Sequence, residues 1–199
     1  MHKAAIVFAA VLGLLLVGCG EQRSPPKVAF KATDITGLDY AKDFDLTDHH
    51  GQRKTLADFK GKVVLVFFGF TYCPDVCPTT MAELADVRKK LGADGEGLQV
   101  LFISVDPERD TPAVLAQYVP AFDAAFLGLT GDTAAVSKVA KDFKLFVQKV
   151  PSRDGKSYTM DHTSGSYVFD RQGRIRLFMR HGQGTEPVLH DLRSLLSAS

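Results

Sequence analysis

The sequence predicts an α/β fold in which a central mixed sheet is flanked by helices. Two apolar runs, residues 62–70 and 98–105, have the pattern of strands that are covered on both faces. Segments with helical periodicity alternate with these runs, as in sheets that carry helices on both sides. The chain has 199 residues, 45% of them hydrophobic and 24% charged, which suits one domain with short extensions.

The remaining elements are predicted from local periodicity and turn residues. Residues 43–57 indicate an extra N-terminal β-hairpin, because alternating apolar and polar residues surround a polar turn that ends in Gly51. Thr111 suits the N-cap of a helix and Pro112 its first position. The other predicted elements are a helix over 79–91, a strand over 126–129, a helix over 133–143, a hairpin of strands 166–170 and 174–180, and a helix over 186–196.

The N-terminus has the pattern of an export signal. Lys3 is followed by an uncharged run from Ala4 to Gly18, which is shorter than the roughly 20 residues of a membrane span but fits a signal-peptide core. The run ends in LVGC and resembles a bacterial lipobox, so residues 1–18 are predicted to be a lipoprotein signal peptide and Cys19 the lipidated N-terminus. A plain signal peptide or a short membrane anchor remains open. We expect an exported, membrane-anchored lipoprotein that faces the periplasm or the cell exterior.

The mature chain is predicted to be one folded domain on a spacer. Residues 19–33 are polar and contain Pro25 and Pro26, so they are expected to form an extended, flexible spacer. The folded body is expected to span residues 34–199, as a monomer. The 24 Lys and Arg residues nearly balance the 23 Asp and Glu residues, which gives no electrostatic reason to expect a nucleic-acid partner.

Two cysteines lie between the first buried strand and its helix, in the segment FTYCPDVCP over residues 70–78. The N–H groups at a helix start stabilise a thiolate, so the pKa of a thiol there is expected to fall. Cys73 is expected to be more exposed than Cys77, and the adjacent Pro74 and Pro78 stiffen the turn. This position is typical of a thioredoxin-like fold, whereas the competing flavodoxin-like sheet would not explain it.

Three chemistries compete for this cysteine pair. A structural disulfide over so short a loop would contribute only about 2 kcal/mol. A redox dithiol usually has a shorter spacing, although oxidation of this pair remains open. Two thiolates also select soft metal ions. Iron–sulfur clusters and structural zinc require four protein ligands, whereas only Cys73 and Cys77 remain once Cys19 is lipidated, so copper is favoured.

Among the six histidines, His162 has the most informative position. It lies just before the predicted strand 166–170, and in a thioredoxin-like fold this loop packs against the cysteine turn. An imidazole there would reach both sulfurs, while Asp161 either orients the ring or faces solvent. The other histidines are expected to have ordinary roles: His2 is removed with the signal, His49 and His50 lie in a polar turn, His181 lies in a loop and His190 lies on the last helix.

Three motifs together resemble the Sco/SenC family. TYCPDVCP over 71–78, VDPERDTP over 105–112 and DHT over 161–163 occur in the family's order, and the resemblance covers about residues 34–196. It implies a thioredoxin-like domain that binds one Cu(I) or Cu(II) through Cys73, Cys77 and His162.

The resemblance also implies a role and partners. The role is delivery of copper to the dinuclear copper centre of cytochrome c oxidase subunit II, or maintenance of that centre's cysteines in the reduced state. The implied partners are this subunit and other copper chaperones. Asp75 would serve in recognition or beside the metal ligands, and Tyr72 would be a packing wall. The alternatives are a thiol–disulfide oxidoreductase of the cell envelope, with Cys73 and Cys77 catalytic, and a copper or redox sensor.

Overall fold

The computed structural model describes residues 29–198, which fold around an eight-stranded mixed sheet. Its strands are β1 (Thr33–Asp34), β2 (Asp45–Asp48), β3 (Arg53–Thr55), β4 (Val63–Gly69), β5 (Leu98–Ser104), β6 (Leu127–Thr130), β9 (Gly165–Phe169) and β10 (Ile175–Arg180). Their spatial order is β1-β10-β9-β4-β5-β6-β2-β3. Strands β4, β5 and β6 are parallel, whereas β9 runs antiparallel to β4. The predicted mixed sheet is therefore confirmed, and the flavodoxin-like alternative is excluded by β9 and β10.

The centre of the sheet consists of β4 and β5, and every residue of both strands is buried. They pair in parallel from Val63 opposite Leu98 to Gly69 opposite Ser104. Both faces of the sheet are therefore covered at these strands, as the uninterrupted hydrophobic runs predicted. Because the strands are parallel, their carboxyl ends meet at one edge, where loops from different parts of the chain come together.

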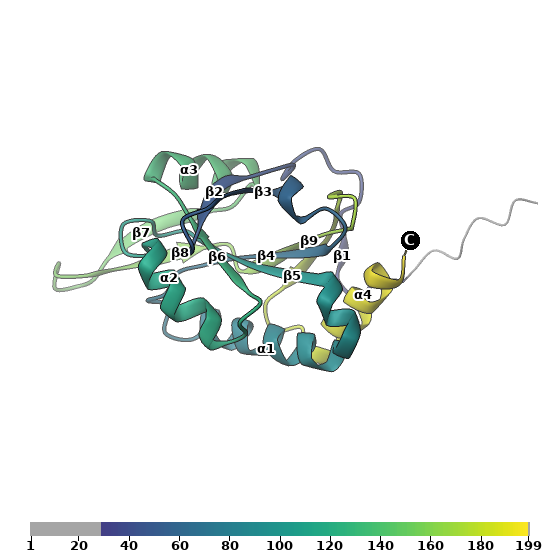
Figure 1. Ribbon diagram of the computed structural model, residues 1–199. Helices are drawn as coiled ribbons and strands as arrows, with labels where there is room; N and C mark the ends of the chain where they lie inside the picture. Colours follow the sequence, from purple (N-terminus) through teal and green to yellow (C-terminus); the bar gives the residue numbers. More distant parts are fainter. Residues whose placement is uncertain (1–28, 199) are drawn as a thin grey trace, which may run out of the picture.

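Helices cover both faces of the sheet. The α-helices are α1 (Val76–Leu91), α2 (Pro112–Tyr118), α3 (Thr133–Asp142) and α4 (Thr185–Ser197), and short 3-10 turns are η1 (Leu56–Phe59), η2 (Gly92–Gly97) and η3 (Val119–Ala121). Figure 1 shows α1 and α4 on one side of the sheet and α3 on the other. The predicted start of α2 is confirmed, since Thr111 caps the helix by accepting a hydrogen bond from the Val114 amide and Pro112 is its first residue.

The N-terminal hairpin of β2 and β3 is confirmed, and it extends the sheet beyond β6. The prediction of an ordinary polar turn is wrong for His49, because this side chain is buried. The Nδ1 atom of His49 accepts a hydrogen bond from the Gly128 amide at 3.0 Å. A Cβ on Gly128 would lie 2.9 Å from the Val119 side chain and 3.0 Å from that of Leu115, so close packing requires glycine at this position. His50 is exposed, as expected.

The described chain is fixed at its start by the last helix. The amides of Lys31 and Ala32 donate to the carboxylate of Asp191, which is buried. Packing therefore begins shortly before Asp34. The predicted signal peptide, Cys19 and most of the spacer lie outside the described residues. Within residues 29–198, no helix has both the length and the apolar composition needed to cross a membrane.

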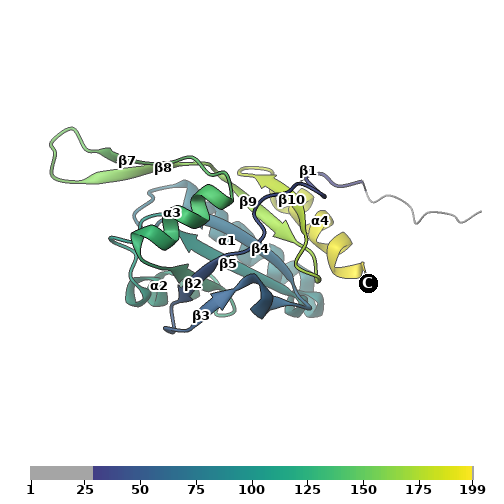
Figure 2. The ribbon, with the colours of Figure 1, turned by 90° about the horizontal axis from the view of Figure 1, so that it is seen from above.

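A second hairpin, which the sequence analysis did not predict, extends away from the body. Its strands β7 (Val147–Pro151) and β8 (Tyr158–His162) form a separate two-stranded sheet. Figure 2 shows it projecting from the end of the molecule opposite β1. The signal for it was present in the sequence, because the dipeptide Asp154-Gly155 is typical of a hairpin turn and Gly155 has a φ of +67°.

Candidate metal centre

The two cysteines lie in the turn between β4 and α1. The Cys73 amide donates to the Phe70 carbonyl at 3.2 Å, and the Cys77 amide points at the Cys73 sulfur, 3.4 Å away. The Cys73 sulfur therefore accepts from an N–H of the first helical turn. Cys73 is partly exposed and Cys77 is fully buried, as predicted, and no disulfide joins them.

Cys77 is enclosed by the end of β4. A Cβ on Gly69 would lie 3.0 Å from the Cys77 sulfur and 2.9 Å from the Phe102 ring, so the absence of a side chain at Gly69 is what admits the sulfur. Burial raises the pKa of Cys77 above its ordinary value. The expectation that the helix start lowers a thiol pKa is therefore wrong for Cys77, because desolvation of the thiolate outweighs the helix N-terminus. Without metal, Cys77 is a neutral thiol.

His162 is the last residue of β8, not part of an irregular loop as predicted. Its Nδ1 donates to the Thr163 carbonyl at 3.0 Å, which leaves Nε2 without a hydrogen and available as a metal ligand. The ring is half-buried and packs edge to face on Phe70, with 6.0 Å between the ring centroids. Burial lowers the pKa of His162, so the imidazole is neutral at neutral pH.

Cys73 and His162 line one pocket of about 320 Å³, together with Phe70, Phe146 and Ser164. Phe146 is 58% exposed at its rim. Larger hollows, of about 620 and 700 Å³, lie along residues 36–45, but they contain none of the cysteines or histidines and offer no comparable chemistry.

The three predicted ligands are close in the fold but are not assembled. Among residues 29–198, no group of three or more His, Cys, Asp and Glu side chains is arranged to hold a metal ion. Cys77 lies beneath Cys73 and does not line the pocket with His162. A metal bound by all three side chains would therefore require the hairpin and the cysteine turn to approach each other.

The residues predicted to assist the site lie around it. Asp75 is exposed at the N-cap of α1, where its side chain caps no amide. Asp161 is exposed, and the His162 ring is oriented by the Thr163 carbonyl rather than by the Asp161 carboxylate. Tyr72, expected to be a packing wall, is 65% exposed. One face of its ring is covered by Arg109, whose guanidinium carbon lies 4.7 Å from the ring centroid.

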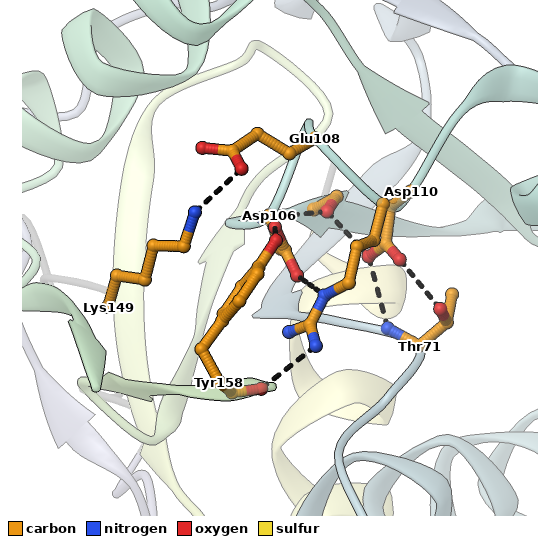
Figure 3. A network of polar contacts seen from close by, with 8 residues as sticks. Thr71, Asp106, Glu108, Asp110, Lys149 and Tyr158 are labelled. Carbon is orange, nitrogen blue, oxygen red and sulfur yellow. Dashed lines mark hydrogen bonds and ion pairs between the residues drawn. The ribbon is translucent and has the colours of Figure 1, made fainter. Parts of the chain in front are cut away.

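A polar network lies beside the site and was not predicted from the sequence. Figure 3 shows Asp106, Asp110 and Tyr158 in this network, which connects the loop after β5 to hairpin β7–β8 and to Thr71. Asp106 and Asp110 are both buried. The signal in the sequence that could have pointed to this network is the density of charges in VDPERDTP.

Comparisons with known proteins agree with this geometry. The sequence model of a family described as SCO1/SenC matches residues 32–197. The chain is 36% identical over 158 residues to "Protein SCO2 homolog, mitochondrial" of Mus musculus, which covers 78% of this chain and 62% of that protein. The chain thus spans somewhat less than two thirds of the length of this relative.

Two solved structures are similar over nearly their whole length. The structure of Bradyrhizobium japonicum ScoI with copper bound is 43% identical, with a TM-score of 0.71, over 77% of this chain and 97% of that chain. Apo Sco1 from Thermus thermophilus is 41% identical, with a TM-score of 0.75, over 84% and 97%. These similarities confirm the thioredoxin-like fold that the position of the cysteines predicted.

Proposed function

The chain belongs to the SCO1/SenC family, and on that premise we propose that it binds one copper ion and serves the assembly of cytochrome c oxidase. The observation that carries the proposal is the shared pocket of Cys73 and His162, with the Cys77 amide directed at the Cys73 sulfur. Two sulfurs and one imidazole form a donor set that selects soft ions such as Cu(I). The copper-bound relative from Bradyrhizobium japonicum supports this choice of metal.

Cys73, Cys77 and His162 are the proposed ligands. His162 would bind through Nε2, since its Nδ1 is committed to the Thr163 carbonyl. Cys77 is a thiol in the metal-free protein, so copper would displace its proton, and binding would release protons to solvent. The hairpin β7–β8 pairs only with itself, so it is the element best suited to carry His162 toward the two sulfurs.

The proposed task is to deliver copper to the dinuclear centre of cytochrome c oxidase subunit II, or to keep the cysteines of that centre reduced. Cys73 is the accessible sulfur, so a ligand of the partner would approach the copper from its side. Phe146 and Asp161 line the pocket, and Asp75 lies between the lining residues Pro74 and Val76. Phe146 and the exposed carboxylates of Asp75 and Asp161 are the proposed contacts for the partner, whether this subunit or another copper chaperone.

The proposed cellular setting follows from the N-terminal sequence. Residues 1–18 would be a lipoprotein signal peptide, Cys19 the lipidated residue, and residues 34–199 the domain exposed outside the cytoplasm as a monomer. Metabolic labelling with a radioactive fatty acid tests this part, because Cys19→Ser should abolish incorporation. Unchanged labelling in that variant would remove Cys19 from the proposal.

Anaerobic titration with Cu(I) tests the metal site. One tight equivalent is expected for the wild type, and it should be lost in Cys73→Ser and in Cys77→Ser. His162→Ala should bind copper more weakly while its thermal unfolding stays unchanged. Cys19→Ser is the matched control, since it removes a cysteine outside the site and should keep one equivalent.

Tight binding in both serine variants at positions 73 and 77 would refute the copper site. Catalytic turnover of a disulfide substrate by the metal-free protein, without copper retention, would instead favour the oxidoreductase alternative.

A further inference from the structure

The position of His162 depends on how hairpin β7–β8 is held against the body of the domain. Within residues 29–198 the two strands pair only with each other, from Val147 opposite His162 to Pro151 opposite Tyr158. A two-stranded hairpin alone is at best marginally stable in water. Contacts with the body of the domain must therefore determine where the end that carries His162 lies.

Arg109, from the loop after β5, makes two of these contacts with the side chain and the backbone of Tyr158. Its guanidinium carbon lies 3.7 Å from the centroid of the Tyr158 ring, and its Nη1 donates to the Tyr158 carbonyl at 2.9 Å. The Tyr158 hydroxyl in turn donates to the carboxylate of Asp106 at 2.9 Å, which Figure 3 shows. Asp106 is buried and also pairs with Nε of Arg109, so the guanidinium is held in one orientation.

The same guanidinium also contacts the cysteine turn. It lies 4.7 Å from the ring centroid of Tyr72, the residue before Cys73, and 5.8 Å from that of Phe70. The Phe70 ring packs against the imidazole of His162. Arg109 thus contacts both the turn with the sulfurs and the hairpin with the imidazole.

We propose that Arg109 is a positioning residue for the metal site, which holds hairpin β7–β8, and therefore His162, at a fixed place relative to Cys73. The inference rests on the proposed copper site. The neighbouring pair of Lys149 and Glu108 joins the same segments at 2.6 Å, but both side chains are about half exposed, and solvent-exposed ion pairs hold structure weakly.

The role requires an arginine rather than a positive charge alone. A planar guanidinium stacks on an aromatic face while its N–H groups donate in fixed directions, whereas a lysine ammonium is a point charge on a flexible stem. Arg109→Lys therefore keeps the charge beside Asp106 but loses the stack on Tyr158 and the bond to its carbonyl. Arg153, exposed in the loop between β7 and β8, provides the matched control Arg153→Lys.

Hydrogen exchange of the metal-free full-length chain is the first test. Amides of β7 and β8 should exchange about tenfold faster in Arg109→Lys than in the wild type, while amides of β4 and β5 keep their protection. Arg153→Lys should match the wild type. Tyr158→Leu, which removes the other half of the stack, should reproduce the effect. Unchanged exchange of the hairpin in both Arg109→Lys and Tyr158→Leu would overturn the proposal.

A double-mutant cycle on copper affinity is the second test. Arg109→Lys should weaken Cu(I) binding about tenfold when His162 is present and should have no further effect in the His162→Ala background. An equal loss in both backgrounds would show that Arg109 does not act through His162, and would refute the role. If the wild type binds no copper, the proposed function itself fails, and the exchange data alone still decide whether Arg109 holds the hairpin.

Discussion

Asp110 and Thr71 are 39 residues apart in the sequence and directly bonded in the fold. The Asp110 carboxylate accepts from the Thr71 amide at 3.0 Å and from the Thr71 hydroxyl at 2.6 Å. It also accepts from the Ser104 hydroxyl at 2.6 Å. Because parallel strands β4 and β5 end side by side, the loop that follows one strand anchors the cysteine turn that follows the other.

Removal of this anchor should destabilise the domain. Asp110→Ala leaves three donors without an acceptor in a buried place, so we expect the free energy of unfolding to fall by about 3 kcal/mol in urea denaturation. Burial raises the pKa of Asp110, so desolvation of the carboxylate offsets part of what its hydrogen bonds contribute. Asp110→Asn should therefore lower the free energy of unfolding by less than Asp110→Ala does. Asp94→Ala, at an exposed position, should leave the midpoint unchanged, and equal midpoints for both alanine variants would contradict the anchoring role.

The two cysteines should differ in reactivity toward iodoacetamide. Cys73 is partly exposed, whereas Cys77 is buried and its pKa is raised by burial, so little reactive thiolate is available there. In a Cys19→Ser background, the metal-free protein should be alkylated at Cys73 at least tenfold faster than at Cys77, as measured by fragment mass spectrometry. Both should react at similar rates in urea. Faster reaction at Cys77 in the native protein would contradict the buried position of its sulfur.

The buried histidine of the N-terminal hairpin should give stability a measurable pH dependence. Burial, and secondarily the charge of His50, lowers the pKa of His49 below its ordinary value of 6.5. The unfolded chain therefore binds the proton more readily than the folded domain, so the contribution is intact above pH 6.5 and is lost as the pH falls toward the folded pKa. The slope from one group is at most about 1.4 kcal/mol per pH unit.

His49→Asn is the corresponding test, because an amide oxygen still accepts from the Gly128 amide but does not titrate. Urea denaturation at several pH values between 7 and 5 should show a smaller loss of stability in this variant than in the wild type. His50→Gln should keep most of the loss, since burial is the main cause. Identical pH profiles for His49→Asn and the wild type would exclude His49 as the source.

Replacement of Tyr118 by phenylalanine should stabilise the domain. Its hydroxyl is buried and has no hydrogen-bond partner within the described residues, while its ring packs on Phe102 and Phe122. Tyr118→Phe should raise the free energy of unfolding by about 1 kcal/mol, because the desolvated hydroxyl is removed and the ring contacts remain. The matched control is Tyr167→Phe, which should lower stability, since the Tyr167 hydroxyl donates to the Phe143 carbonyl at 2.8 Å. A loss of stability in Tyr118→Phe would indicate a partner for its hydroxyl.

Several features of the fold and site could be predicted from local sequence. The buried runs that became β4 and β5 need neighbours on both faces wherever they occur, so their pattern alone identified central strands. The start of α2 followed from Thr111 and Pro112, because capping depends only on adjacent residues. The burial of Cys77 relative to Cys73 followed from their order between a strand and a helix.

Hairpin β7–β8 was missed although a turn signal was present. β7 does not alternate between buried and exposed residues, and β8 alternates only between half-buried and exposed ones, so neither strand has the wholly buried face that marks a sheet strand. The lowered thiol pKa was predicted for a helix start but does not hold for Cys77, because the cost of desolvation depends on Gly69 and Phe102, which pack around it only in three dimensions.

Local patterns of strand, helix and cap residues were enough to predict the class of fold and the turn between β4 and α1 that carries Cys73 and Cys77. The folded domain was needed to show that Asp110 holds Thr71, that His49 is buried, and that Arg109 lies between the hairpin and the cysteine turn. These relationships join residues far apart in the chain. The contacts of Asp110 and Arg109 arise from the parallel pairing of β4 with β5, which brings the loops at their carboxyl ends into contact, whereas His49 is buried because β2 pairs with β6.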